Sequence, residues 1–318
     1  MPVTGEPVCV APTGDVCGEG AVWHSAHQAV YWTDINRFLI HRFTPADLCV
    51  RTWIFDEPVT ALTLTDQPDV LGVILGSGVI LWEPANDRRR DPFFRLDSWP
   101  KVRLNDARAD PRGSLWIGSM RNNVNSDGSG GEAGGKDGAL FRIDFDGDAK
   151  DEVKVKVKVK VKVWRKNIGI ANTLAWSPDR RHFYFGDTLA NVIWRFDYDP
   201  ATGAIENEQP FLKGFDRGLP DGSAVDSKGY LWNCRFFGNC IVRVAPDGKI
   251  DRVIEMPVKN ITTCTFGGSD LKTLYVTTAR IEAPAGDRLA GGLYAIPTEV
   301  AGQPENVFRI SSPGEPEL

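Results

Sequence analysis

The chain has 318 residues, and 42% of them are hydrophobic, which is enough to bury a sizeable core in a single β-rich domain. Its formal net charge of −5 argues against a nucleic-acid partner, because binding nucleic acid would favour a basic face. The N-terminal sequence MPVTGEPVCVAPTGD lacks the basic start and apolar run of a signal peptide, and no stretch has the length of a membrane span. We expect a cytoplasmic protein that binds neither nucleic acid nor membrane, as a monomer or a small homo-oligomer.

The six cysteines show no paired C-x-x-C spacing of the kind that binds zinc. Cys234 and Cys240 flank the sequence RFFGN, so they could face each other across a hairpin and form a disulfide. A reduced chain is the simpler interpretation for a cytoplasmic protein.

One phrase recurs along the chain at intervals of about 40 to 50 residues. Each copy consists of a short strand, a polar turn and an apolar strand that ends in small or acidic residues. The copies are GEGAVWHSAHQAVYWTDI from Gly18, RLNDARADPRGSLWIGSM from Arg103, ANTLAWSPDRRHFYFGDT from Ala171, LPDGSAVDSKGYLWNCR from Leu219 and TTCTFGGSDLKTLYVTT from Thr262. A repeat of this length with about four strands is typical of a β-propeller. We predict an all-β fold, a single six-bladed propeller domain over residues 1–318.

The predicted blades follow one another in chain order. They cover residues 18–58, 59–100, 101–168, 169–215, 216–259 and 260 to about 310. The N-terminal PVCVAP is too short for a blade, so we expect it to supply the outer strand of the last blade. That pairing would close the ring and remove the exposed sheet edge.

The third blade is longer than the others because of two insertions. Residues 122–138 form a Gly-rich loop on the side of the channel mouth, where it could act as a lid or could be a surface loop without a role. Residues 152–164 alternate Val and Lys, which predicts a strand with one apolar and one charged face. We interpret it as an extension of the outer strands of the blade, without a catalytic role.

Four polar residues stand at the starts of the predicted inner strands, where packing alone would not select them. They are Glu19, Asn105, Asn172 and Asp221. Inner strands of a propeller begin at the mouth of the central channel, so these side chains should converge from different blades. Two carboxylates and two amides suit a hard divalent cation such as Ca²⁺, Mg²⁺ or Mn²⁺. The four histidines stand elsewhere, although Zn²⁺ or Fe²⁺ could still use oxygen ligands.

Four segments resemble, in order, the motifs of the senescence marker protein/gluconolactonase family, also called regucalcin-like. They are GEGAVW, R-x-ND with DPRGSLWIGSM, N-x-LAWSPD and PDGSAVDSKGYLW. The resemblance covers residues 18 to about 310, apart from the two insertions. It implies a six-bladed propeller with one divalent metal in the channel, either Ca²⁺, Mn²⁺, Zn²⁺ or Fe²⁺. It also implies hydrolysis of a sugar lactone, with activity on organophosphates in some members.

Carried over by position, the resemblance makes Glu19, Asn172 and Asp221 the metal ligands. It places Asn105 near the metal, and it gives both Arg103 and Asn105 a role in binding substrate. The family often has Gly after each of two motif positions, where this chain has Thr173 and Ala107. Neither departure removes a ligand, but both could alter the shape of the site.

The expected reaction needs a polarised carbonyl and an activated water. A cation can act as a Lewis acid on the carbonyl, and a neighbouring carboxylate can accept the proton of water. Asp221 is our candidate base, with Glu19 as the alternative. The competing functions are a non-enzymatic calcium-binding propeller and an organophosphate triester hydrolase.

Other acidic residues have simpler explanations. We expect Asp34 and Asp187 to bond to neighbouring strands, although they could line the pocket, and Asp106 to brace its turn. Asp110, Asp179 and Asp226 lie in predicted turns, and the preference of Asp for turns explains their presence there.

Overall fold

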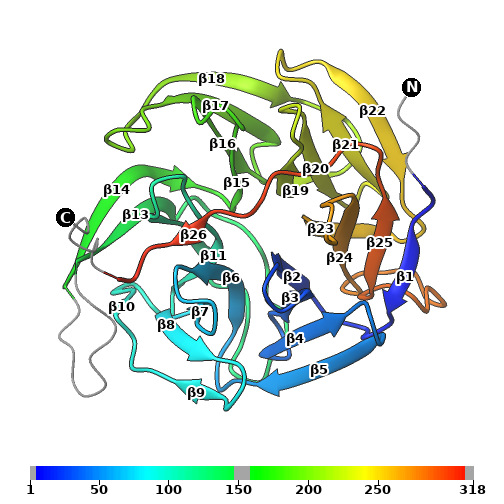
Figure 1. Cartoon of the computed structure of the whole chain (residues 1–318), viewed down its shortest axis with the longest axis horizontal. Helices are drawn as coiled ribbons and strands as arrows, with labels where there is room; N and C mark the ends of the chain where they lie inside the picture. Colours follow the sequence, from blue (N-terminus) through cyan, green and yellow to red (C-terminus); the bar gives the residue numbers. More distant parts are fainter. Residues whose placement is uncertain (1–4, 147–157, 312–318) are drawn as a thin grey trace.

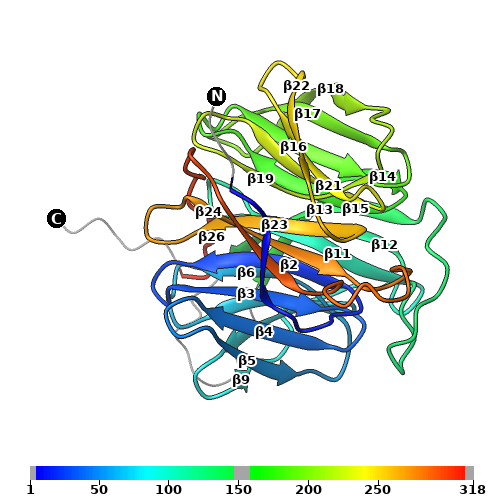
Figure 2. The same cartoon turned by 90° about the vertical axis from the view of Figure 1, so that its right-hand side faces the viewer.

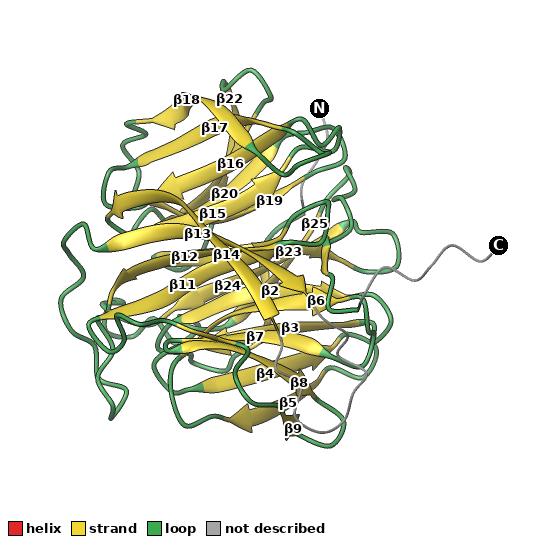
Figure 3. Cartoon of the chain, turned by 90° about the vertical axis from the view of Figure 1, so that its left-hand side faces the viewer, coloured by secondary structure: helices red, strands yellow, loops and turns green. Residues whose placement is uncertain are grey.

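The computed structural model describes residues 5–146 and 158–311, and these residues form strands and loops with no helix (Figure 3). Six sheets are arranged in a ring around a central axis, as Figure 1 shows along the short axis of the molecule. The prediction of an all-β, six-bladed propeller is therefore confirmed. Because the described residues include no helix, none is long and apolar enough to cross a membrane.

The blades follow the predicted order, and each begins with its innermost strand. The first blade contains β2 (Gly18–His24), β3 (Ala29–Asp34), β4 (Leu39–Thr44) and β5 (Cys49–Ile54). The second contains β6 (Val59–Thr65), β7 (Leu71–Leu75) and β8 (Gly78–Glu83), with the short β9 (Arg88–Arg89) and β10 (Phe94–Arg95). The third contains β11 (Val102–Ala109), β12 (Leu115–Arg121), β13 (Gly138–Asp146) and β14 (Lys158–Ile168). The fourth blade contains β15 (Ala171–Trp176), β16 (His182–Asp187), β17 (Val192–Tyr198) and β18 (Ile205–Lys213). The fifth contains β19 (Leu219–Val225), β20 (Leu231–Phe236), β21 (Cys240–Val244) and β22 (Ile250–Glu255). The sixth contains β23 (Asn260–Gly267), β24 (Thr273–Ala279) and β25 (Leu293–Pro297), together with β1 (Val8–Ala11).

The N-terminal strand closes the ring as predicted. β1 pairs antiparallel with β25, with Cys9 opposite Tyr294, and thereby becomes the outer strand of the sixth blade. The blade is thus built from both ends of the chain, and β25 no longer presents a free edge.

The structure corrects the predicted end of the sixth blade, which we placed at about residue 310. Residues 298–311, which we call the C-terminal strap, leave the blade after β25 and cross one face of the ring (Figure 1). The short β26 (Val307–Phe308) then pairs in parallel with the end of β6 in the second blade. The amide of Arg309 donates to the backbone oxygen of Gly113 at 2.9 Å, which fixes the strap to the third blade as well. The prediction failed here because a two-residue pairing leaves no periodic pattern in the sequence.

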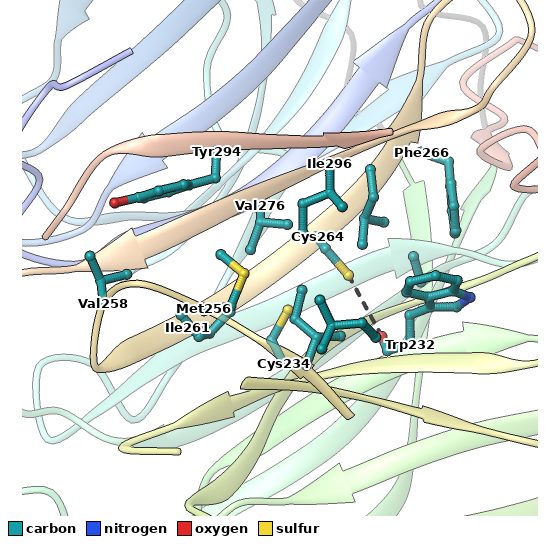
Figure 4. Packing of buried hydrophobic residues seen from close by; sticks show 14 of the residues in the cluster. Trp232, Cys234, Met256, Val258, Ile261, Cys264, Phe266, Val276, Tyr294 and Ile296 are labelled. Atoms are coloured by element: carbon teal, nitrogen blue, oxygen red, sulfur yellow. Dashed lines mark hydrogen bonds between the residues drawn. The ribbon is translucent and has the colours of Figure 1, made fainter. Parts of the chain in front are cut away.

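Adjacent blades pack through apolar side chains on the faces of their sheets. Between the fifth and sixth blades, Trp232 and Met256 meet Cys264 and Phe266 (Figure 4), and the two aromatic rings lie edge to face with centroids 5.6 Å apart. The possible disulfide does not form, since all six cysteines are free. Across the hairpin, Cys240 faces Arg235 rather than Cys234, so the two thiols extend from opposite faces of the sheet.

The repeated turn motifs have a structural role. The Asp110 carboxylate accepts hydrogen bonds from the backbone amides of Arg112 and Ser114 and from the indole of Trp116. Asp226 makes the equivalent bonds with Lys228, Tyr230 and Trp232. The interpretation of these two acids as turn residues is confirmed.

The Val-Lys run lies partly outside the described residues. Its second half, from Lys158, belongs to β14, which pairs antiparallel with β13 as the outer strand of the third blade. Val161 and Val163 are each 43% exposed, so the apolar side of the strand is only partly covered. The Lys162 ammonium lies 3.4 Å from the centre of the Trp164 ring.

Candidate active site

The candidate residues lie at one end of the channel. The start of β11 pairs with the end of β12, so Arg103 and Asn105 stand on the face from which the β12–β13 loop projects. Figure 2 shows this loop on one face and the strap on the opposite face. The site therefore opens on the face that the strap does not cross.

Every inner strand has an irregularity in its pairing at this end. The register shifts in β2 between Glu19 and Val22, in β15 between Asn172 and Ala175, and in β19 between Pro220 and Ser223, with similar shifts in β6, β11 and β23. A β-bulge turns side chains out of the regular alternation. The repeated bulge is therefore the local reason why polar residues of separate blades can face the channel rather than the packed sheets.

Glu19 and Asp221 form a carboxyl pair drawn from the first and fifth blades. Each carboxyl group acts on the pKa of the other, and both residues are buried, 9% and 6% exposed respectively. Burial, followed by the negative charge of Asp106, raises the pKa of Glu19 to about 8. Burial and the charge of Glu19 raise the pKa of Asp221 well above its ordinary value. Without a bound cation, the pair retains protons at neutral pH.

The two amides join the third and fourth blades. Asn105 Nδ2 donates to Asn172 Oδ1 at 2.9 Å and to the backbone oxygen of Ala171 at the same distance. Asn172 Nδ2 donates to Thr188 Oγ1 at 2.8 Å, and the Thr188 hydroxyl donates to the backbone oxygen of Pro220. These bonds fix the Asn172 amide with its oxygen on the side of Asn105, and they link it to the residue that precedes Asp221.

Arg103 is the cation of the site. Its guanidinium donates to Asn105 Oδ1 at 2.6 Å and to Asn123 Oδ1 at 3.0 Å, and the residue is only 4% exposed. Burial lowers the pKa of Arg103 to about 10, against the opposing effect of Cys17, Glu19 and Asp221. The guanidinium thus remains charged at neutral pH and lies within electrostatic reach of the carboxyl pair.

This donor set fits a divalent cation. Two adjacent buried carboxyls without a strong cationic partner are unfavourable when ionised, and a cation between them would remove that penalty. Carboxylate and amide oxygens are also the ligands that hard cations prefer. The described residues contain no cluster of three or more His, Cys, Asp or Glu side chains suited to a metal.

Thr173 occupies a backbone conformation that favours glycine. Its φ is +53°, in the left-handed region, where a β-branched residue is unusual. Its hydroxyl donates to the backbone oxygen of Asp221 and lies 2.9 Å from Ser223 Oγ, so it connects the fourth and fifth blades. The departure from the family's Gly is therefore accommodated by hydrogen bonds that a glycine could not make.

The acids that end the second strands bond to the backbone, as expected. Asp34 accepts hydrogen bonds from the amides of Val16 and Cys17, and Asp187 accepts them from Gly169 and Ile170. Each carboxylate thus anchors the segment that leads into the inner strand of its own blade.

Asp106 does more than brace its turn. It accepts hydrogen bonds from the backbone amides of Ala107 and Leu174, and burial raises its pKa to about 6. Its charge acts on Glu19 on one side and on Arg108 on the other, and Arg108 lies 3.2 Å from Glu305 of the strap. A line of buried charges thus runs down the channel, which sequence spacing did not indicate because Glu305 lies outside the repeat.

Three further residues at the site were missed. Asn123 binds Arg103, and Thr188 binds Asn172. The third, Cys17, has a thiol whose pKa is raised well above its ordinary value by burial and by the charges of Glu19 and Asp221. The sequence could have indicated Thr188 through the motif FGDT, in which Thr188 follows Asp187 at the end of a second strand.

The 122–138 loop reaches from the third blade to the first. Asn36 Nδ2 donates to the backbone oxygen of Gly128 at 2.9 Å, and Asn123 at the base of the loop holds Arg103. A local bridge between Val124 and Gly130 gives the loop its own structure. The loop therefore spans part of the channel mouth and contacts a residue of the candidate site.

Comparisons with known proteins agree with this architecture. Residues 17–280 match the family model described as the SMP-30/Gluconolactonase/LRE-like region. A pentonolactonase of Haloferax volcanii is 32% identical over 93% of this chain and 96% of its own length, and an L-arabinolactonase of Azospirillum brasilense is 32% identical over 94% of each chain. The crystal structure of a calcium-binding protein, regucalcin, from Agrobacterium tumefaciens superposes with a TM-score of 0.84 at 25% identity, over 96% of this chain and 98% of that one. The chain belongs to the SMP-30/gluconolactonase family.

Proposed function

We propose that this protein hydrolyses a sugar lactone to the open-chain sugar acid, with one divalent cation bound by Glu19, Asn172 and Asp221. The observation that carries the proposal is the buried carboxyl pair, which lies within electrostatic reach of the charged Arg103. Through Asn105, Arg103 is linked to the amide oxygen of Asn172. Lactonases among the relatives, acting on pentonolactones and on L-arabinolactone, support an aldonolactone as the substrate class.

The cation would supply Lewis acidity for the lactone carbonyl and for the oxyanion that develops on it. Asp221 is the proposed general base, because it could bind the cation through one carboxylate oxygen and accept a proton from water through the other. Glu19 is the alternative base.

Arg103 and Asn105 are the proposed substrate-binding residues. Four of the five N–H groups of the guanidinium bind Leu104, Asn105 and Asn123, and the fifth could bind a hydroxyl or the ring oxygen of a sugar. Asn105 holds both Arg103 and Asn172, so substrate and cation would be positioned by one amide. Such fixed placement limits the substrates that the site accepts.

The alternative is a calcium-binding propeller without catalysis, which is favoured by the description of the regucalcin relative as a calcium-binding protein. Hydrolysis of gluconolactone and of a pentonolactone, followed by pH-stat with and without chelator, separates the two functions. An organophosphate triester added to the panel tests the hydrolase alternative that uses the same ligands.

The decisive variants are Glu19→Gln and Asp221→Asn, which keep the shape of each side chain and remove its charge. We expect each to lower lactone turnover by about 100-fold or more while the β-sheet circular dichroism stays unchanged. Asp69→Asn is the matched control, because the Asp69 side chain is 94% exposed, and it should retain full activity. Near-normal turnover of either site variant would refute the assignment.

A further inference from the structure

A second cavity opens on the opposite face of the propeller, away from the carboxyl pair. It has a volume of about 510 Å³ and lies between the β11–β12 turn, the β15–β16 turn and the C-terminal strap. This is the face that carries the strap in Figure 2. The residues that decide its chemistry are Asp110, Arg112, Trp176, Arg180, Glu305 and Arg309.

Three arginines from three different segments line this cavity. Arg112 belongs to the β11–β12 turn, and one of its nitrogens donates to the backbone oxygen of Thr202 at 2.8 Å. Arg180 belongs to the β15–β16 turn and Arg309 to the strap, and both are exposed. Within residues 5–146 and 158–311, neither of these two guanidinium groups has a hydrogen-bond or ion-pair partner. Two uncompensated positive charges on one cavity are notable in a chain of net charge −5.

The acidic residues that line the cavity are already engaged. Asp110 accepts three hydrogen bonds within its own turn and from Trp116. Glu305 lies 3.2 Å from Arg108 and accepts a hydrogen bond from the hydroxyl of Thr265. Both carboxylates are therefore held by other partners, and neither forms an ion pair with Arg180 or Arg309 within the described residues.

Trp176 supplies an independent observation. It contributes to the cavity wall and is 2% exposed, yet its indole N–H has no hydrogen-bond partner in the described part of the chain. By contrast, the indoles of Trp32, Trp116 and Trp232 each bind an aspartate. A buried donor without an acceptor is costly. The Trp176 nitrogen is itself buried, so the donors of this wall that a ligand can reach are the guanidinium groups of Arg180 and Arg309. A ligand that supplies acceptors would complement these two groups.

We propose that this cavity is a binding site for a small phosphate monoester. A dianionic, tetrahedral phosphate can accept hydrogen bonds from several directions at once, which suits arginines that enter from three segments better than a planar, singly charged carboxylate does. The volume exceeds that of a bare phosphate and leaves room for the organic part of an ester. The site is distinct from the proposed lactonase site and does not depend on it.

The test is a titration of the full-length protein at constant ionic strength, followed by calorimetry and by tryptophan fluorescence. Inorganic phosphate, glucose 6-phosphate and gluconate serve as probes for the bare anion, the ester and a carboxylate of similar size. We expect glucose 6-phosphate to bind saturably and at least tenfold more tightly than gluconate. Arg180→Gln/Arg309→Gln should raise its dissociation constant at least tenfold.

The charge-matched control is Arg88→Gln/Arg95→Gln, which removes two exposed arginines from β9 and β10 of the second blade. It should change the dissociation constant less than twofold. The proposal is overturned if glucose 6-phosphate does not saturate, if gluconate binds as tightly, or if only inorganic phosphate binds. Equal weakening in the two double variants would also overturn it, because the effect would then come from net charge alone.

Discussion

Asn105 Nδ2 donates to Asn172 Oδ1 at 2.9 Å, across the boundary between the third and fourth blades. The same Asn105 accepts a hydrogen bond from Arg103 through its own oxygen at 2.6 Å. One amide therefore orients both a proposed cation ligand and an arginine whose charge lowers the pKa of Glu19. Asn105 is in this sense a positioning residue as well as a proposed substrate contact.

Replacing Asn105 by Ala should weaken cation binding even though Asn105 is not a proposed ligand. Loss of a residue that orients a metal ligand typically costs about 10- to 100-fold in affinity. We expect a rise of that size in the dissociation constant for Ca²⁺ or Mn²⁺, measured by calorimetry on protein stripped of metal. Asn306→Ala is the control, because Asn306 donates to a backbone oxygen on the strap face and should leave the affinity unchanged. Unaltered affinity in Asn105→Ala would show that Asn172 is oriented by Thr188 alone.

The metal-free protein should lose stability as the pH rises. The pKa of Glu19 is about 8 in the folded protein, above its ordinary value, so between about pH 4.5 and 8 the folded state keeps a proton that the unfolded chain has released. The free energy of unfolding therefore falls with rising pH across this window, and Asp221 acts in the same direction. We expect the melting temperature of metal-free protein to fall from pH 5 to pH 8.

A bound cation favours the ionised carboxylates and should reverse this trend. The rise in melting temperature on adding Ca²⁺ or Mn²⁺ is expected to be larger at pH 8 than at pH 5. Glu19→Gln, which cannot ionise, should flatten the pH dependence of the metal-free protein, whereas Asp69→Asn should not. A metal-free protein equally stable at pH 5 and pH 8 would contradict the raised pKa values.

The sequence predicted the architecture well because the propeller repeat is carried by local signals. Each blade begins with an apolar strand and a polar turn, and in the third and fifth blades an Asp of this turn binds a Trp of the next strand, as in Asp110–Trp116 and Asp226–Trp232. These signals lie within about ten residues of one another and recur in register. The strap could not be predicted in this way, since its pairing of Val307 with Leu64 joins residues far apart in the chain and involves only two positions.

The site was predictable to the extent that it follows the repeat. Glu19, Asn172 and Asp221 all lie near the starts of inner strands, where the bulges recur. Glu19 and Asn172 are the last paired residues before their bulges, and Asp221 lies one position further on, inside the bulge of β19. Contacts that break the repeat were not visible in the sequence. Asn123 is in an insertion and Glu305 is in the strap, and both reach the channel only because the chain returns to it.

Thr173→Val should destabilise the protein through lost hydrogen bonds rather than through backbone strain. Valine is also β-branched, so the cost of φ at +53° remains similar, but the hydroxyl that binds the backbone oxygen of Asp221 disappears. Leaving that buried acceptor with fewer partners should cost about 1–3 kcal/mol. Chemical denaturation measures the change. Thr44→Val, at the less buried end of β4, is the control and should stay within about 0.5 kcal/mol of the parent protein.

The loop of residues 122–138 should act on substrate binding through its contact with the first blade. Asn36→Ala removes the hydrogen bond to Gly128, 92 residues away in the chain, and frees the loop from that side of the channel mouth. Because Asn36 lies apart from the carboxyl pair, we expect KM for the preferred lactone to rise about three- to tenfold with kcat nearly unchanged. Steady-state kinetics on a gluconolactone and pentonolactone panel provides the measurement. Asn86→Ala, which alters an exposed turn on the second blade, is the matched control and should leave both constants unchanged. If KM of the Asn36→Ala protein is unaltered for every lactone, the contact between Asn36 and the loop has no part in substrate binding. If only kcat falls, the contact acts on the chemical step instead.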